Sequence, residues 1–335
     1  MQAVQWSRSG DPAEVAELVD LPAPPPPGAG EAQLAPEYAP VNPADLLRMQ
    51  GSYGSSTEDL PAFAGGEGIA RVLAVGPGVA HIVAGDLVLI PLGRGCWRTV
   101  LNVHAAGLFA LQGGDPQQLA MLGINAPTAW RLLHDVVQLQ AGDWIVQNAA
   151  ASAVGRMVIQ LAQRMGVRTL NIVRRPEQVS ELRALGGDKV FVEGPSLAER
   201  VESELREPIR LAIDAVAGTA TGTLAGMLAE GGTLVTYGLL SGEPCKINAR
   251  DIVFRDIRHR GFWLARYRNL EPEASKQIAE QLLQLVNQGV LRTPIAAVYE
   301  LVDVCAALRH AQQQGRDGKV LLRIGKGRLE SNSAI

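Results

Sequence analysis

Apolar and polar positions follow three different patterns along the chain. In residues 1–116, short apolar runs such as GIARVLAV and GDLVLIPL are separated by glycine, proline and charged residues. Short apolar runs bounded by turn residues are typical of strands. This first stretch therefore predicts a β-rich module.

Residues 117–267 alternate between strand and helix patterns. The apolar run WIVQNA (144–149) precedes VGRMVIQLAQRMG, a predicted helix that ends at Gly166 and whose apolar face is formed by Val154, Val158, Leu161 and Met165. Further strands are predicted in RTLNIV, KVFV, LAIDAV, GTLVTYG and RGFWLA, and a further helix in PEQVSELRALGG. Such alternation predicts a doubly wound parallel sheet with helices on both faces.

The last stretch, residues 268–335, returns to the first pattern. An amphipathic helix in PEASKQIAEQLLQLVNQG is followed by two predicted strands, TPIAAVYEL and GKVLLRIG. We therefore expect an α/β protein in which residues 1–116 and 268–335 form a β-rich domain and residues 117–267 form an inserted dinucleotide-binding domain. The length of 335 residues agrees with two hydrophobic cores rather than one.

Composition and charge argue against several partners. The net charge of −3, with both signs interspersed, gives no electrostatic basis for nucleic acid as the main partner. No apolar stretch reaches the ~18 residues of a membrane span. The first residues, MQAVQWSRSGDP, lack the features of a signal or transit peptide, so the cytoplasm is the expected location.

Cysteine and histidine are too scattered to predict a metal centre. Cys96, Cys245 and Cys305 form no Cys-x-x-Cys pair, and the five histidines lie far apart in the sequence. We therefore expect neither a disulfide framework nor a bound metal.

The turn after the predicted strand WIVQN is a candidate pyrophosphate site. A dinucleotide-binding turn usually reads G-x-G-x-x-G, whereas residues 150–155 here read AASAVG, with Gly155 as the one remaining glycine. Small residues at this place also allow a strand and a helix to pack closely. The position, between a strand and a long helix, favours the pyrophosphate interpretation.

Two arginines follow the next predicted strand. A site for NAD normally ends that strand with Asp or Glu, which binds the ribose hydroxyls, but this chain has NIVRRPE, with Arg174 and Arg175. Guanidinium groups suit a 2′-phosphate. The pair therefore favours NADPH as the cofactor. The alternative is that both arginines are simply solvated surface residues.

The β-rich stretch resembles the medium-chain dehydrogenase/reductase superfamily, in which a Rossmann domain is inserted into a GroES-like module. The resemblance is carried by VNPADLL (41–47), GGEGIARVLAVGPGV (65–79) and GDLVLIP (85–91). Zinc-containing members have Cys where Asn42 stands and His where Gly66 stands, and they carry a four-cysteine lobe that is missing here. The chain is therefore similar to a zinc-free branch.

Within that branch the chain resembles the mitochondrial-type trans-2-enoyl thioester reductases. The match runs nearly end to end, through MQGSYG, GCWRTV, LGINAPTAWRLL, VQNAAASAVG, RTLNIVRRPE, VTYGLLSG and RGFWLARY. One departure is the segment AAASAVG, which lacks a glycine that many relatives have; another, PCKINARD, has no clear counterpart.

This resemblance implies a set of site residues. Tyr53 would be the catalytic residue at the substrate carbonyl, Trp97 would shape the acyl entrance, and no metal would take part. The implied cofactor is NADPH, and the implied cofactor-binding residues are Asn125, Thr128, Ala151, Ser152, Ala153, Val154, Arg174, Arg175, Tyr237, Gly238, Leu239, Leu240, Phe262, Trp263, Leu264, Ala265 and Lys319.

The implied reaction is NADPH-dependent reduction of the C2=C3 bond of a trans-2-enoyl thioester, carried by coenzyme A or acyl carrier protein. Hydride goes to Cβ and a proton to Cα, while Tyr53 stabilises the enolate oxygen or protonates the enolate. Tyr53 could instead be a turn aromatic folded against the surface, and Glu67 either a buried structural carboxylate or an active-site group.

The sequence is also compatible with two other functions. One is an NADPH quinone oxidoreductase of the same zinc-free branch, and the other is a non-catalytic NADPH-binding sensor. We also expect a homodimer, because RGFWLA is predicted to be an apolar strand at the edge of the parallel sheet.

Overall fold

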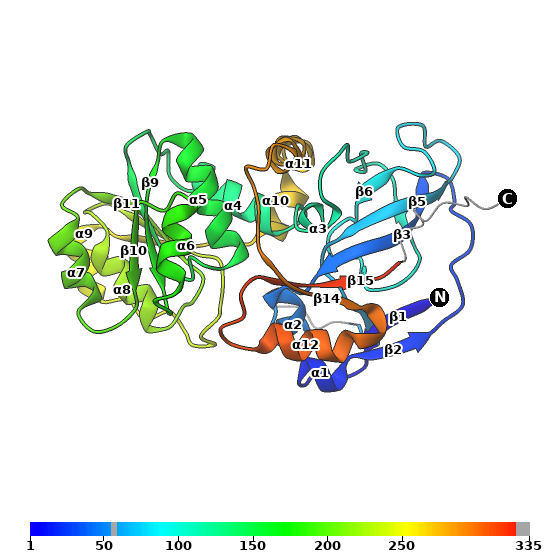
Figure 1. Cartoon of the computed structure of the whole chain (residues 1–335), viewed down its shortest axis with the longest axis horizontal. Coiled ribbons are helices and arrows are strands. Elements are labelled where there is room, and N and C mark those ends of the chain that lie inside the picture. The colour runs from blue at the N-terminus through cyan, green and yellow to red at the C-terminus, as the bar shows by residue number, and fades with distance from the viewer. Residues whose placement is uncertain (55–58, 326–335) are drawn as a thin grey trace. The chain divides into compact units, whose positions relative to one another are not determined.

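The computed structural model describes residues 1–54 and 59–325, which form two compact units (Figure 1). The β-rich unit contains residues 1–124, 272–289 and 293 onward. The parallel-sheet unit contains residues 125–271 and 290–292. The second unit is thus an insertion within the first.

The β-rich unit is built on two sheets. The smaller has the order β2-β1-β4, and the larger has the order β14-β15-β3-β5-β6, with β7 also paired to β3. Their strands are β1 (Gln2–Trp6), β2 (Glu17–Asp20), β3 (Glu31–Pro40), β4 (Ala62–Phe63), β5 (Ile69–Val75), β6 (Leu87–Leu89), β7 (Leu101–His104), β14 (Ile295–Glu300) and β15 (Lys319–Arg323).

Strand β15 brings the tail of the chain back into the β-rich unit. It pairs antiparallel with β3 and parallel with β14, so the tail of the chain completes the sheet that the first residues begin. The helices of this unit are α1 (Pro12–Val15), α2 (Pro43–Met49), α3 (Pro116–Leu119), α11 (Pro272–Asn287) and α12 (Val304–Gln312), with one 3-10 turn, η1 (Leu301–Asp303).

The parallel-sheet unit confirms the predicted doubly wound sheet. All its paired strands run parallel, in the order β10-β9-β8-β11-β12-β13. They are β8 (Trp144–Gln147), β9 (Arg168–Val173), β10 (Lys189–Val192), β11 (Ile209–Asp214), β12 (Thr233–Thr236) and β13 (Arg258–Gly261). The helices are α4 (Asn125–His134), α5 (Ala153–Met165), α6 (Gln178–Ala184), α7 (Leu197–Glu204), α8 (Thr219–Met227), α9 (Ala249–Arg255) and α10 (Leu264–Leu270).

Two separate cores cover the two faces of this sheet. Leu197 of α7 and Leu224 of α8 pack on one side of the strands, and Ile159 of α5 and Leu182 of α6 pack on the other. Strands covered on both faces are apolar along their whole length, and β9 is accordingly buried at every position after Arg168.

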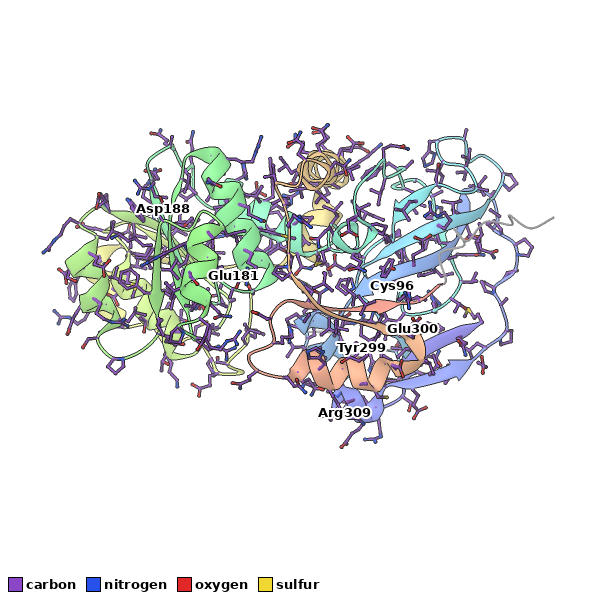
Figure 2. All side chains as sticks on the ribbon, in the orientation of Figure 1. Cys96, Glu181, Asp188, Tyr299, Glu300 and Arg309 are labelled. Carbon is purple, nitrogen blue, oxygen red and sulfur yellow. The ribbon has the colours of Figure 1, made fainter. Side chains whose placement is uncertain are left out.

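Helix α5 is more deeply buried than its sequence pattern predicts. Eight consecutive residues, Gly155–Ala162, are buried, so this helix is enclosed on most sides instead of presenting one apolar face. Its buried Arg156 pairs with Glu181 of α6 at 2.8 Å (Glu181 is labelled in Figure 2). The ion pair lets a charged residue occupy an interior position.

The prediction for RGFWLA was wrong. The last strand of the sheet is Arg258–Gly261, all of whose residues are exposed, and helix α10 begins at Leu264. The strand ends before the apolar residues of the segment begin. The first of these, Phe262, turns inward and is buried. The edge position of the strand was right, but its apolar character was not.

Candidate active site

The turn between β8 and α5 has the form of an anion-binding site. Ser152 begins the helix, and its Oγ accepts a hydrogen bond from the N–H of Gly155 at 3.1 Å. The first N–H groups of a helix have no partner within it, so those of Ala153 and Val154 lie at its positive end. A Cβ on Gly155 would lie 2.6 Å from the carbonyl oxygen of Ala150, which explains why this glycine remains.

A buried carboxylate organises the ends of the neighbouring strands. Asp214, the last residue of β11, is fully buried and accepts hydrogen bonds from Asn148 Nδ2 at 2.6 Å and Thr221 Oγ1 at 2.7 Å. The N–H groups of Val216 and Ala217 also donate to it. Asp214 thereby ties the end of β8 to the loop after β11. Strand crossovers diverge between these two strands, which is where doubly wound sheets bind ligands.

The loop after β12 joins the same region. Tyr237 N–H donates to the carbonyl of Asp214 at 2.9 Å, and Leu240 N–H donates to that of Ala215 at 3.2 Å. The Tyr237 hydroxyl is hydrogen-bonded to Ser152, and burial raises the pKa of this phenol. The structure thus brings two predicted site segments, the 150–155 turn and the 237–240 loop, into direct contact.

Gly238 is required for this contact. A Cβ at this position would lie 2.5 Å from the carbonyl oxygen of Ala215. Leu239 and Leu240, by contrast, are exposed. They face solvent within this unit.

Arg174 and Arg175 follow the carboxyl end of β9, as predicted. Arg174 is exposed and Arg175 is half-buried. A cavity of about 270 Å³ opens at the same end of the sheet, lined by Asn148, Ile172, Glu193, Gly194, Leu197, Ala220, Thr223 and Leu224. Small-molecule sites typically measure about 300–1,000 Å³, so this cavity suits one part of a dinucleotide.

Asn125 and Thr128 lie on the first turns of α4 and are both buried. The segment 262–265, predicted to line the same end of the cofactor, continues from the edge strand. The backbone N–H of Phe262 donates to Thr236 at 2.9 Å, and the Phe262 ring is buried, whereas Trp263 is half-exposed.

In the β-rich unit, Tyr53 comes just after helix α2. The N–H groups of Gly51 and Ser52 bond back to the carbonyls of Arg48 and Leu47 and end the helix. Tyr53 is half-buried and makes contacts with other groups. The next part of its loop, residues 55–58, lies outside the described residues.

A buried polar cluster lies at the other end of α2. Asn42 donates through Nδ2 to Glu67 Oε1 at 2.8 Å and accepts from the Lys319 ammonium. Lys319 also donates to the Val41 carbonyl at 3.1 Å, and the backbone N–H of Ile124 donates to Glu67 Oε2 at 2.6 Å. Glu67 is therefore a buried carboxylate with several partners. Lys319 is directed at this cluster, and its predicted contact with a cofactor stays a prediction.

Burial controls the ionisation of this cluster. It raises the pKa of Glu67 to about 7, although the nearby Lys319 ammonium and the Asn42 amide oppose the rise. It lowers the pKa of Lys319 to about 8, with Glu67 opposing the fall. Burial also raises the pKa of Asp45. A proton can thus reside on Glu67 at near-neutral pH.

Trp97, which was expected to shape the acyl entrance, lies in the interior of the β-rich unit. This side chain has no solvent-exposed surface and belongs to the main core of the β-rich unit. Its backbone pairs with Val4 and Ala64 at 2.8 and 2.9 Å, which holds it between the strands. Trp97 is thus a core residue of this unit, and its expected role at the acyl entrance stays a prediction.

The side chains near Asn42 do not resemble a metal-binding set. Asn42 uses both ends of its amide within the cluster, and Gly66 has no side chain. The thiol of Cys96 (labelled in Figure 2) donates to the Glu67 carbonyl at 2.9 Å, and burial raises its pKa. In residues 1–54 and 59–325, no three or more His, Cys, Asp and Glu residues form a metal-binding group.

Sequence reasoning missed the polar networks around Asp214 and Glu67. Each had a signal, since Asp214 interrupts the apolar strand pattern LAIDAV and Glu67 stands alone in the glycine-rich segment GGEG. Charged residues inside apolar or glycine-rich segments are rarely buried without partners. The partners themselves are distant in sequence and emerge only in the folded chain.

Two domain families match the chain. Residues 28–124 match the alcohol dehydrogenase GroES-like domain, and residues 153–283 match a domain described as zinc-binding dehydrogenase. No helix in the described part of the chain is long and apolar enough to cross a membrane.

Curated relatives and solved structures extend the match to nearly the whole chain. The human mitochondrial enoyl-[acyl-carrier-protein] reductase is 36% identical over 332 residues, 96% of this chain and 88% of that protein. A quinone oxidoreductase from Pseudomonas syringae is 26% identical with a TM-score of 0.86, covering 96% of this chain and 99% of the other. A mitochondrial 2-enoyl thioester reductase heterodimer from Candida tropicalis shares the fold, at 24% identity, a TM-score of 0.84 and coverage of 96% and 99%.

Because the enzyme relatives are named as mitochondrial, the expected cytoplasmic location stays a prediction. The 36% identity to the human enzyme, over 96% of this chain, is more than two proteins need to share a fold. The chain therefore belongs to the medium-chain dehydrogenase/reductase superfamily, in the family of the mitochondrial-type enoyl-[acyl-carrier-protein] reductases.

Proposed function

We propose that this protein uses NADPH to reduce the C2=C3 double bond of trans-2-enoyl thioesters. The observation that carries the proposal is the 36% identity to an enoyl-[acyl-carrier-protein] reductase over 96% of the chain. The local geometry of the parallel-sheet unit supports the cofactor, and the residues of the β-rich unit support chemistry without a metal.

The residues of the parallel-sheet unit fit NADPH. The pyrophosphate would bind the N-terminus of α5, where Ser152 leaves the N–H groups of Ala153 and Val154 for an anion. The 2′-phosphate would bind Arg174 and Arg175, since β9 ends without the carboxylate that NAD sites use. The adenine would occupy the cavity beside the end of β9.

When bound, NADPH supplies the hydride that goes to Cβ of the enoyl thioester. The chain must then stabilise the negative charge that develops on the thioester oxygen. We assign this role to Tyr53, because a phenol donates a hydrogen bond at neutral pH and no cation-binding group is present around Asn42 in the described structure. Removing such a donor typically costs about 3 kcal/mol of transition-state stabilisation.

Helix α2 positions the proposed donor. The Asn42 cluster holds its N-terminal end, where the backbone N–H of Asn42 also donates to Asp45 Oδ2 at 2.8 Å. Tyr53 follows its C-terminal end. We infer that the buried cluster serves Tyr53 indirectly, by fixing the helix that leads to it.

The test is a steady-state assay with NADPH and enoyl-CoA substrates of increasing chain length, starting from crotonyl-CoA. We expect turnover with NADPH and much weaker turnover with NADH at equal concentration. Measurements with acyl carrier protein thioesters would identify the natural carrier. The absence of enoyl reduction at any chain length would contradict the proposal.

A second candidate is reduction of quinones, which the structural similarity to a quinone oxidoreductase favours. The two functions need the same cofactor site and differ in their need for Tyr53. Turnover of a soluble quinone that survives the Tyr53→Phe change, without enoyl turnover in the unchanged protein, would establish this alternative.

We further propose that the protein forms a homodimer through strand β13. This strand ends the order of the parallel sheet, and its residues are exposed. The neighbouring helix α9 exposes Val253 and Phe254, at 68% and 69%, and two adjacent exposed apolar side chains suit an interface. Light scattering at micromolar concentration should give twice the chain mass, and the double change Val253→Glu, Phe254→Glu should give the monomer mass. A monomer before any change would refute this proposal.

A further inference from the structure

Arg131 is a buried charge that the proposed function has not used. It lies on α4 with 2% of its surface exposed. Its Nη1 donates to Asp135 Oδ2 at 2.7 Å and to Glu271 Oε2 at 3.0 Å. Its Cζ lies 5.1 Å from the ring centre of Tyr267, which is within the range of a cation–π contact.

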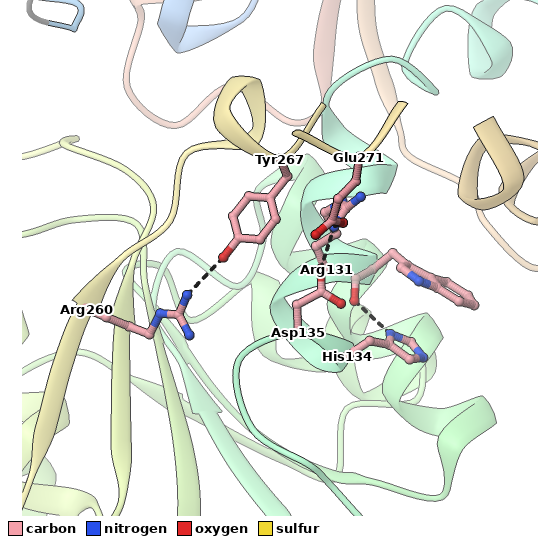
Figure 3. A network of polar contacts seen from close by, with 7 residues as sticks. Arg131, His134, Asp135, Arg260, Tyr267 and Glu271 are labelled. Atoms are coloured by element: carbon pink, nitrogen blue, oxygen red, sulfur yellow. Dashed lines mark hydrogen bonds and ion pairs between the residues drawn. The ribbon is translucent and has the colours of Figure 1, made fainter. Parts of the chain in front are cut away.

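Two of these partners belong to the segment around α10. Tyr267 lies within α10 and Glu271 directly follows it (Figure 3). The Tyr267 ring stacks on Phe262, with ring centres 5.0 Å apart, and its hydroxyl accepts a hydrogen bond from Arg260 at 2.9 Å. Arg131 therefore contacts the same ring that holds the start of the 262–265 segment.

The position of Arg131 on α4 links this segment to two predicted site residues. Asn125, Thr128 and Arg131 are spaced three residues apart, and residues at that spacing lie on neighbouring parts of a helix surface. Asn125 and Thr128, at one end of this row of residues, are expected at the nicotinamide. Arg131, at the other end, contacts the segment around α10.

We propose that Arg131 is a positioning residue for the nicotinamide end of the cofactor site. It fixes α10, and through Tyr267 the 262–265 segment, relative to Asn125 and Thr128 on α4. The inference rests on the proposed function, because it assumes that these residues surround bound NADPH. It adds a residue that the family resemblance did not supply.

The shape of the guanidinium explains why arginine occupies this position. Its Cζ lies over the Tyr267 ring while one of its nitrogens, Nη1, donates to two carboxylates. A lysine ammonium is a point charge without a planar face or a fork of donors. Arg131→Lys should therefore preserve the charge and only part of the positioning.

The experiment separates the two ends of the cofactor. Direct binding of NADPH and of adenosine 2′,5′-bisphosphate, which lacks the nicotinamide half, is measured together with kcat for enoyl reduction. The variants are Arg131→Met, Arg131→Lys and Glu271→Gln. The matched control is Arg210→Met, which removes a partly exposed arginine paired with Asp143 in the same unit.

We expect Arg131→Met to lower kcat about ten- to a hundredfold and to weaken NADPH binding, because small displacements of reacting groups have effects of that size. Binding of the bisphosphate should stay within about twofold of the unchanged protein. Arg131→Lys should recover part of kcat. Glu271→Gln should act in the same direction more weakly, and it keeps the test decisive if Arg131→Met fails to fold, because Glu271 is half-exposed.

Equal losses of NADPH and bisphosphate binding would show a general structural role and overturn the inference. Unchanged kcat in both Arg131→Met and Glu271→Gln would also overturn it, as would an effect of the same size in Arg210→Met. If the unchanged protein binds neither nucleotide, the proposed function itself fails and this inference fails with it.

Discussion

The ionisation of Glu67 offers a quantitative test of the buried cluster. Its carboxylate is fully buried, accepts from Asn42 and Ile124, and faces the Lys319 ammonium. Burial is the largest influence and raises its pKa from the ordinary 4.5 to about 7. Replacing it by Gln in Glu67→Gln keeps the shape and removes the ionisation.

The sign of the pH effect follows from the raised pKa. The folded protein binds the Glu67 proton more tightly than the unfolded chain, so this stability is present below about pH 4.5 and is lost as the pH rises through about 7. The difference of about 2.5 in pKa corresponds to about 3 kcal/mol, at about 1.4 kcal/mol for each tenfold change in the acid constant. The wild-type protein should therefore lose about 2–3 kcal/mol between pH 5 and 8 relative to Glu67→Gln.

Two measurements check this prediction. Denaturant unfolding of both proteins across pH 5–8 gives the difference in stability, and infrared difference spectra report the C=O stretch of the protonated carboxyl directly. Glu37→Gln is the control, since Glu37 belongs to the same unit and pairs with the partly exposed Arg71. A stability difference between wild type and Glu67→Gln that does not change from pH 5 to 8 would refute the reasoning.

Three further changes probe the proposed site. Tyr53→Phe should lower kcat for enoyl reduction about 10²–10³-fold with little change in NADPH affinity, measured by steady-state kinetics and direct titration; an unchanged kcat would remove Tyr53 from the mechanism. Arg174→Gln with Arg175→Gln should raise KM for NADPH at least about tenfold and leave KM for NADH unchanged, because only NADPH carries the 2′-phosphate; parallel changes in both would argue against this assignment. Ala149→Gly should leave the free energy of unfolding unchanged or raise it by up to about 1 kcal/mol, as measured by thermal unfolding. Ala149 has a φ of 47°, which glycine adopts without steric cost. A loss above about 1 kcal/mol would contradict backbone strain at this turn.

Much of the fold followed from local sequence patterns. Strand β9 and its neighbour β10 have the bounds that RTLNIV and KVFV predict, because strands buried on both faces form continuous apolar runs. Ser152 and Gly166 bound α5 through local interactions, a side-chain cap and a left-handed glycine with a φ of 69°. Such signals depend only on nearby residues.

The end of the edge strand and the depth at which side chains are buried could not be predicted in the same way. RGFWLA has the composition of a strand, but Phe262 is buried against Tyr267, and the chain leaves the sheet at Gly261. The GCWRTV segment gives no sign of how deeply its tryptophan is buried, yet Trp97 is enclosed by strands that are distant in sequence. Burial of this kind depends on which elements pack together, and a local pattern does not contain that information.

The sequence by itself determined the class of the protein, the parallel sheet with the small-residue turn after β8, and the pair of arginines after β9. These features are short, contiguous and set by backbone geometry or by one local charge. Only the tertiary structure showed that Asn42 joins Lys319 to Glu67, that Asp214 joins β11 to the end of β8, and that Arg131 contacts Glu271 after α10. Each of these contacts joins residues far apart in the chain, and their charges are stable in the interior because the fold supplies the partner that desolvation requires.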